Sequence, residues 1–415
     1  MNQYFHYRQD KLFVENVALA DIAERFATPT YVYSRASLTD AYRQYAEALK
    51  GREHLICFAV KSNPNLSILK LFAKLGAGFD IVSGGELQRV LAAGGQASKV
   101  VFSGVGKSGA EMRQALEAGI LCFNVESEAE LARLNDVAGG MGKVAPISFR
   151  VNPNVDAKTH PYISTGLKQS KFGVAYTDAL ALYRKASKMQ HLRITGIDCH
   201  IGSQLTEVSP FIAAAEKVLL LVDTLAREGI KLEHIDLGGG LGICYKDETP
   251  PSIAEYANAL LSALHGRTEK LIVEPGRVLV GNAGVLLTKV EYLKPGEEKN
   301  FAIVDAAMND LMRPALYDAY HAIQPVARRA PPLRQYEVVG PVCESGDFLG
   351  HARDLAIEQG DLLALMSAGA YGMSMSSNYN TRPRAAEIMV DGDTVNLIRE
   401  REKIEQLFDA EKIYL

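Results

Sequence analysis

The sequence predicts an α/β protein, built as a closed (β/α)8 TIM barrel that is followed by a mostly antiparallel β domain. Two observations indicate this architecture. Between residues 54 and 277, short apolar or β-branched runs alternate with stretches of helical period, which is the pattern of consecutive βα units. After residue 277, short extended runs are separated by turn residues such as Asp391-Gly392-Asp393, which is typical of an antiparallel sheet.

Eight apolar runs in the first region are predicted to be strands, the number that a TIM barrel requires. Several helical stretches between them end in glycine, as at Gly94, Gly119 and Gly229, which suits the left-handed residue after a helix. An open, doubly wound sheet has the same local rhythm and remains the alternative. The predicted strands are 55–60, 79–82, 100–103, 122–126, 147–151, 195–200, 234–238 and 271–275, and the clearest helical stretches are 84–94, 109–119, 177–189 and 209–229.

The change of pattern also defines the expected domains. Residues 35–277 are assigned to the barrel, and residues 1–34 with 278–415 to a β domain that contributes substrate-site residues. Extended runs at 13–18 and 30–34 could belong to either domain. Strands of the β domain are predicted at 285–293, 300–305, 335–340, 361–366, 385–390 and 393–397.

Composition restricts the class of function. The chain has 45 Lys+Arg against 49 Asp+Glu, a net charge of −4, which argues against nucleic acid or an anionic membrane as a partner. No apolar run is long enough to span a membrane, and the N-terminus lacks the pattern of a signal peptide. The five cysteines form no C-x-x-C pair, so we expect reduced thiols, a cytoplasmic location and no bound metal.

Polar residues follow the predicted strands at the ends where a barrel carries its active site. Lys61 ends the first strand, where desolvation would favour a neutral amine that can attack a carbonyl. The Gly238–Gly240 run follows strand seven, and its backbone N–H groups could approach a phosphate, with Ser203 and Arg277 adding a hydroxyl and a cation. A solvent-exposed lysine and an ordinary tight turn are the alternatives for these features.

Two further residues suit a planar, nitrogen-containing ring. His200 ends strand six and could stack on such a ring, or it could be a structural histidine. Glu274 ends strand eight and could keep a pyridine nitrogen protonated, or it could pair with Arg277. An amine, a phosphate site, a stacking ring and a carboxylate together predict a site for pyridoxal 5′-phosphate.

One motif points to a different cofactor. The Gly104–Gly109 segment fits G-x-G-x-x-G, follows a predicted strand and opens a helix, and Glu126 ends the next strand. This resembles a dinucleotide fingerprint, so a nicotinamide dehydrogenase is an alternative. The motif lies in the third βα unit and does not open the fold, which weakens that interpretation.

Several motifs resemble those of the alanine-racemase-like (fold type III) pyridoxal-phosphate decarboxylases, and the likeness covers essentially the whole chain. The principal motifs are F-A-V-K-S-N-P-N at 58–65, H-I-G-S-Q at 200–204, G-G-G at 238–240 and E-P-G-R at 274–277, and supporting runs lie at 152–156, 159–166, 171–173 and 340–347. Within this family the chain is most similar to the enzymes that convert meso-2,6-diaminopimelate to L-lysine and CO2. The resemblance therefore implies a decarboxylase in lysine biosynthesis.

The resemblance also implies residue roles in a homodimer with shared active sites. Lys61 would hold the cofactor covalently, His200 would stack on its ring, and Glu274 would pair with the ring nitrogen. Cys343, as a catalytic acid, and Glu344 would come from the partner subunit. The phosphate and adjoining groups would be bound by the segments that contain Ser203, Gly239, Gly240, Gly276 and Arg277. The amino-acid substrate would be contacted by Arg277, Arg313, Tyr317 and Tyr371. Tyr371 would also contact the cofactor.

Other activities of this family remain open. The most similar alternative is a decarboxylase of ornithine, arginine or carboxynorspermidine, although the Cys343-Glu344-Ser345 triplet favours diaminopimelate as the substrate. An amino-acid racemase shares the barrel and the cofactor. A non-catalytic regulator is the third, and the presence of Lys61 and Cys343 argues against it. The length of the loop at 152–176 suggests a lid.

Overall fold

The computed structural model describes residues 3–155, 171–330 and 332–414. The chain divides into two compact units. The barrel unit comprises Ala41–Ile243 and Thr249–Val278, and the β unit comprises Met1–Asp40, Cys244–Glu248 and Leu279–Leu415. Most of the predicted lid loop and the run at 159–166 lie outside the described residues.

The barrel unit contains the eight parallel strands that the sequence predicts. Neighbouring strands pair in the order β5-β6-β7-β8-β9-β11-β12-β13, and β13 pairs with β5, so the sheet closes on itself. This closure confirms the barrel and rules out the open doubly wound sheet. The strands are β5 His54–Ala59, β6 Gly78–Ile81, β7 Val100–Phe102, β8 Cys122–Val125, β9 Ala145–Asn152, β11 Leu192–Asp198, β12 His234–Asp236 and β13 Lys270–Val273, with the short β10 Val174–Ala175 paired to β9.

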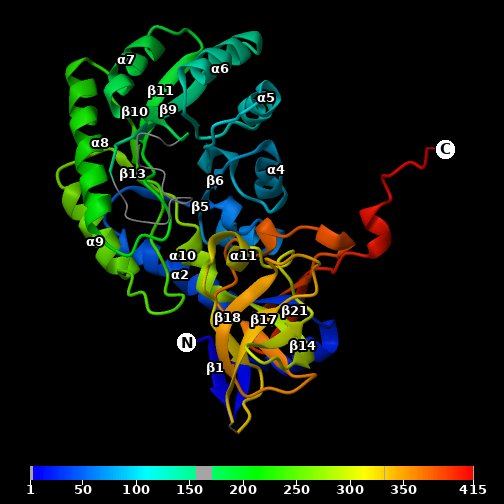
Figure 1. Cartoon of the computed structure of the whole chain (residues 1–415). Coiled ribbons are helices and arrows are strands. Elements are labelled where there is room, and N and C mark those ends of the chain that lie inside the picture. Colours follow the sequence, from blue (N-terminus) through cyan, green and yellow to red (C-terminus); the bar gives the residue numbers. More distant parts are fainter. Residues whose placement is uncertain (1–2, 156–170, 331, 415) are drawn as a thin grey trace. The chain divides into compact units, whose positions relative to one another are not determined.

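Helices lie outside the strands (Figure 1), as in a barrel with alternating βα units. Serine side chains cap several of them, and Ser108 and Ser252 form complete capping boxes with a glutamate three residues later. Gly119 closes its helix in the left-handed conformation, as predicted. The helices are α2 Arg35–Ala48, α3 Leu66–Lys74, α4 Gly84–Ala92, α5 Gly109–Ala118, α6 Glu128–Gly140, α7 Tyr176–Ala186, α8 Ser209–Arg227, α9 Ile253–Ala263 and the short α10 Arg277–Val280.

The β unit is mostly antiparallel, as predicted. Its main sheet runs in the order β18-β17-β15-β14-β4-β20-β21, and β19 joins β14 to β16. The run at 30–34 forms β4 in the middle of this sheet, and a separate sheet holds β1, β2 and β3. The elements are β1 Phe5–Arg8, β2 Lys11–Val14, β3 Val17–Ala18, α1 Leu19–Phe26, β4 Thr30–Ser34, β14 Gly284–Lys294, β15 Asn300–Val304, α11 Arg313–Tyr317, β16 Ile323–Pro325, β17 Arg334–Val339, β18 Phe348–Leu355, β19 Leu362–Leu365, β20 Ala386–Asp391 and β21 Thr394–Arg399.

The apolar faces of these elements form the core of the β unit. Val32 of β4, Leu287 of β14 and Ile388 of β20 are fully buried side by side with Leu12 and Leu19 from the N-terminal segment. This packing explains why the first 40 residues belong to the β unit. Among the described residues, no helix combines the length and apolar character that crossing a bilayer would need.

Candidate active site

Lys61 stands directly after β5, at the end of the barrel where the strands finish. Its Nζ lies 3.1 Å from Oδ2 of Asp80, a fully buried residue near the end of β6, while the Lys61 side chain keeps 38% of its surface exposed. The amine is thus accessible yet anchored to the barrel interior. The amine that we expect to attack a carbonyl therefore has a buried carboxylate as its partner.

His200 follows β11 and is held by the glycine run. The N–H of Gly239 donates to His200 Nδ1 at 3.2 Å, so the ring hydrogen of a neutral His200 lies on Nε2. Burial, together with the charges of Arg150 and Lys61, keeps the pKa of His200 well below its usual value. His200 is therefore a neutral ring with a fixed tautomer.

The Gly238–Gly240 run packs tightly against its neighbours. The N–H of Gly238 donates to Asp236 Oδ1 at 2.8 Å, and a Cβ on Gly239 would lie 2.2 Å from the carbonyl oxygen of Glu274. Gly238 and Gly240 have φ of +66° and +118°, a region that favours glycine. Two of the three N–H groups that we expected to face an anion are donated to protein side chains instead.

Ser203 and Arg277 meet across two loops of the barrel. The guanidinium of the buried Arg277 donates from Nη2 to Oγ of Ser203 at 3.0 Å. Gly276 lies beside them, and a Cβ there would come within 3.2 Å of the side chain of Ser62, next to Lys61. The predicted phosphate residues after β11 and β13 therefore lie close together.

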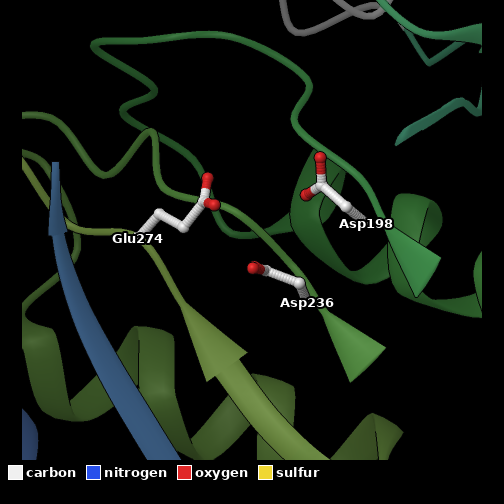
Figure 2. A group of neighbouring side chains, drawn as sticks. All are labelled: Asp198, Asp236 and Glu274. Atoms are coloured by element: carbon white, nitrogen blue, oxygen red, sulfur yellow. The ribbon is translucent and has the colours of Figure 1, made fainter. Parts of the chain in front are cut away.

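Three carboxylates converge inside the barrel at the same end (Figure 2). Asp198 ends β11, Asp236 ends β12 and Glu274 follows β13, and one oxygen of each lies within 4.8 Å of the others. All three are buried. Nε of Arg150 on β9 lies 4.0 Å from Asp198 Oδ2. Glu274 alone of this group was predicted from the sequence.

Burial of these acids disfavours their charged forms. It raises the pKa of Asp236 to about 7, with Asp80 adding to the shift. It also raises the pKa of Asp198 and of Glu274 well above the usual values, with Asp236 the next cause for both. Three neighbouring buried carboxylates cannot all ionise, so the group holds at least one proton at neutral pH.

The Gly104–Gly109 segment makes structural contacts. The buried Lys107 Nζ donates to the carbonyl oxygen of Gly104 at 2.8 Å and pairs with Glu130 at 2.7 Å. Glu126 accepts the N–H of Gly104 at 2.7 Å. The charged residues of the apparent dinucleotide motif therefore hold neighbouring βα loops together.

Arg313, Tyr317 and Tyr371 belong to the β unit. Arg313 begins α11, where its guanidinium lies 4.6 Å from the ring centroid of Tyr245 and Nη1 lies 2.9 Å from Nε2 of His321. Tyr317 ends the same helix and is half-buried. Aromatic and imidazole groups thus fix the direction of the Arg313 cation.

Tyr371 has a backbone conformation that is rare for a bulky residue. Its φ is +55°, and it is flanked by Gly369 and Gly372, where an added Cβ would lie 2.0 Å from Val280 O and 2.5 Å from Ala368 O. Left-handed backbone in a non-glycine residue costs energy and is concentrated at functional sites.

Cys343 and Glu344 lie on an exposed loop of the β unit between β17 and β18. The N–H of Cys343 donates to Asn380 Oδ1 at 2.9 Å. The buried Asp347 shapes the loop, because Oδ2 accepts the N–H of Val342 at 2.8 Å and Oδ1 accepts that of Met308 at 2.7 Å. Within a single chain, both predicted side chains are accessible.

The structure thus brings the barrel residues of the predicted site together and places the remaining ones in the β unit. Four charged residues of the barrel interior were not predicted from the sequence. A signal was available, because each interrupts an apolar run at a position near the end of a strand. These residues are Asp80, Arg150, Asp198 and Asp236.

Comparison with known proteins gives one family throughout. Residues 35–281 match the family model of the pyridoxal-dependent decarboxylase, pyridoxal binding domain. The chain is 60% identical over 409 residues to diaminopimelate decarboxylase of Pseudomonas aeruginosa and 57% identical over 412 residues to that of Vibrio cholerae, with 99% of each chain covered.

Solved structures agree with these relatives. Diaminopimelate decarboxylase of Helicobacter pylori, complexed with L-lysine, superposes with a TM-score of 0.91 at 45% identity, covering 94% of this chain and 98% of that one. Diaminopimelate decarboxylase of M. jannaschii, also in complex with L-lysine, superposes with a TM-score of 0.95 at 40% identity, covering 100% of this chain and 98% of that one. The chain therefore belongs to the diaminopimelate decarboxylases, within the pyridoxal-dependent decarboxylase family.

Proposed function

We propose that this chain decarboxylates meso-2,6-diaminopimelate to L-lysine and CO2 with pyridoxal 5′-phosphate, as the last step of lysine biosynthesis. The observation that carries the proposal is the grouping of Lys61, His200 and Glu274 at the ends of three barrel strands. The relatives that match over the full chain are named for this activity, and two similar structures are complexes with L-lysine.

The barrel residues fit the cofactor. Bound pyridoxal phosphate supplies a protonated ring that accepts the electron pair released as CO2 leaves. Lys61 would hold the aldehyde carbon, and the neutral ring of His200 would pack on the ring face. Glu274 Oε1 is buried and lacks a hydrogen-bond partner among the described residues, so the carboxylate can accept further hydrogen bonds, one of them from a protonated ring nitrogen.

Three loops would bind the phosphate and the adjoining groups, and these loops carry Ser203, Gly239, Gly240, Gly276 and Arg277. The hydrogen bond between Arg277 and Ser203 supports this assignment, because it orients a fixed cation beside a hydroxyl. The close packing at Gly276 supports it too, since a larger residue would press on Ser62 beside Lys61.

Diaminopimelate carries a second amino-acid end, and residues of opposite charge would select it. Arg277, Arg313 and Tyr317 would hold the distal carboxylate through charge-assisted hydrogen bonds. Glu344 would pair with the distal ammonium, and Tyr371 would contact both cofactor and substrate. The contacts of Arg313 with Tyr245 support its role, because they fix the guanidinium before any substrate arrives.

Cys343 would donate the proton that replaces CO2 on Cα. We propose that Cys343 and Glu344 act in the site of a partner subunit, so that the enzyme is a homodimer. The exposure of both side chains within a single chain supports this arrangement. All five cysteines are free, which fits an enzyme of the reducing cytoplasm.

The test is incubation of the purified protein with pyridoxal phosphate and meso-diaminopimelate. We expect equal amounts of lysine and CO2. Parallel reactions with ornithine, arginine and carboxynorspermidine should release little CO2, and L-alanine should keep its configuration. Faster CO2 release from one of the other substrates would reassign the specificity, and racemised alanine would reassign the reaction.

A further inference from the structure

Asp236 lies directly beneath Glu274 in the barrel. Arg150, Asp198 and Asp236 pair at one level on β9, β11 and β12. Asp236 also pairs with Ile272 on β13, and Glu274 stands two residues further along, so its side chain projects from the same face one layer nearer the mouth. A carboxylate oxygen of Asp236 comes within 4.8 Å of one of Glu274 (Figure 2).

The two carboxylates are incompletely hydrogen-bonded. Asp236 Oδ1 accepts the N–H of Gly238 at 2.8 Å. Among the described residues, neither Asp236 Oδ2 nor Glu274 Oε1 has a hydrogen-bond partner, and both atoms are buried. Two adjacent carboxylates with unsatisfied oxygens are stabilised when they share one proton, as in the paired acids of aspartic proteases.

The nearest cations already have other carboxylate partners. Arg150 lies 3.3 Å from Glu126 and 4.0 Å from Asp198, and Lys61 lies 3.1 Å from Asp80. The titratable or charged groups that interact with Asp236 or Glu274 from the surrounding elements are Lys61, Asp80, Arg150, Asp198, Cys57, Cys122 and Tyr256. A proton is therefore the remaining way to neutralise one charge of the Asp236–Glu274 pair.

We propose that Asp236 is a positioning residue that shares a proton with Glu274 and so fixes the charge and direction of the carboxylate at the cofactor ring nitrogen. This inference rests on the proposed function, in which Glu274 meets that nitrogen. The protonated Asp236 donates to Glu274, which stays ionised toward the ring. The other oxygen of Asp236 accepts the N–H of Gly238, and the next residue, Gly239, donates its N–H to His200.

Two substitutions separate the shared proton from simple packing. Asp236→Asn mimics the protonated acid, because its Oδ1 can accept from Gly238 while its Nδ2 donates to Glu274. Asp236→Ala removes both contacts. The exposed Asp178 of α7 provides a matched control, Asp178→Asn. Circular dichroism and thermal unfolding check that each variant folds.

The readouts are the cofactor dissociation constant of each cofactor-stripped protein and the ¹⁵N chemical shift of ring-labelled pyridoxal phosphate, which reports protonation of its nitrogen. Asp236→Asn should stay close to the wild type in both. Asp236→Ala should bind the cofactor about tenfold more weakly and lose ring protonation, as expected for a lost buried hydrogen bond. If Asp236→Ala does not fold, Asp236→Asn alone tests the inference, which predicts that the cofactor ring nitrogen stays protonated in this variant.

Two results would overturn the inference: Asp236→Ala matching the wild type, or Asp236→Asn losing ring protonation, which would require an ionised Asp236. Both leave the proposed function intact if the wild type binds pyridoxal phosphate and forms lysine. A wild-type protein that does neither would refute the proposed function itself.

Discussion

Replacing Lys61 with alanine removes the proposed attachment point of the cofactor and the partner of buried Asp80. We expect Lys61→Ala to lose all covalent cofactor and all measurable lysine formation. Borohydride treatment followed by mass spectrometry would show the wild type gaining the mass of the reduced cofactor and the variant gaining none. Lys61→Arg, which keeps a cation near Asp80, should also lack the adduct but unfold at a higher temperature than Lys61→Ala. A covalent adduct in either variant would reject the role of Lys61.

His234 makes the stability of the barrel depend on pH. Burial lowers the pKa of this residue to about 4, against 6.5 for the free side chain. Between these values the unfolded chain binds more protons than the folded one, so stability is lost as pH falls from 6.5 toward 4. We expect the free energy of unfolding of His234→Asn, measured with urea on the cofactor-free protein, to fall by roughly 3 kcal/mol less than that of the wild type between pH 6.5 and 4. The exposed His265→Asn should leave the pH dependence unchanged, and an equally steep loss in His234→Asn would contradict the prediction.

At the scale of single residues, the groups that stand just after the barrel strands were predicted from the sequence, and the charged groups within the strands were not. Lys61, His200 and Glu274 stand immediately after apolar runs, where chemical function is expected. Asp198 and Asp236 lie inside the predicted strands. Only the register of neighbouring strands brings those two acids together, and register depends on pairing between distant segments.

The glycine run after β12 is an element whose shape requires the absence of side chains. In Gly239→Ala the new Cβ would lie 2.2 Å from the carbonyl oxygen of Glu274, so the loop must move. We expect cofactor affinity to fall by at least about tenfold, since loop and His200 shift together. Gly106→Ala is the matched control, because no atom lies within 4 Å of a Cβ there. Equal affinities in an equilibrium titration would show that the loop tolerates the methyl group.

The loop that carries Cys343 depends on Asp347. This buried carboxylate accepts N–H groups from both Val342 and Met308, and alanine can accept neither. We expect Asp347→Ala to lower kcat strongly while cofactor binding stays near normal, because the barrel unit is untouched. Stopped-assay lysine formation and cofactor titration would measure the two effects. Unchanged turnover would indicate that the position of Cys343 does not matter.

Elements with strong apolar patterns were predictable, and those with mixed patterns were not. All eight barrel strands were found, because buried parallel strands read as continuous apolar runs. β18 was missed because Phe348–Leu355 contains Gly350, His351 and Arg353, which break the alternation of an antiparallel strand. β1 and the three-residue β16 were missed as well; β16 is too short to show any period.

At the scale of the whole molecule, the proposed homodimer predicts complementation between inactive variants. Lys61→Ala retains Cys343, and Cys343→Ala retains Lys61. If each site takes these residues from different subunits, random mixing after mild unfolding should restore about a quarter of the wild-type activity. Mixing without subunit exchange is the control and should restore none. Failure to recover activity despite exchange would indicate that each chain builds its own site.

The fold class followed from counting βα units, but the closed ring itself did not. An open sheet and a barrel share the same local rhythm, and the pairing of β13 with β5 distinguishes them. That pairing joins segments that no local pattern connects. The same limit applies to the barrel residues of the site, which lie between Lys61 and Arg277 and follow several different strands.

The pairing of β13 with β5 has a consequence for how the enzyme matures. Leu271 lies opposite His54, and the backbone N–H of Ala59 donates to the carbonyl oxygen of Pro275, so Lys61 and Glu274 stand on either side of this seam. A chain emerging from the ribosome therefore lacks the complete pocket until residue 275 has left the exit tunnel. Binding of pyridoxal phosphate is consequently a late event in the synthesis of the chain, and truncated nascent chains should not compete for free cofactor in the cell.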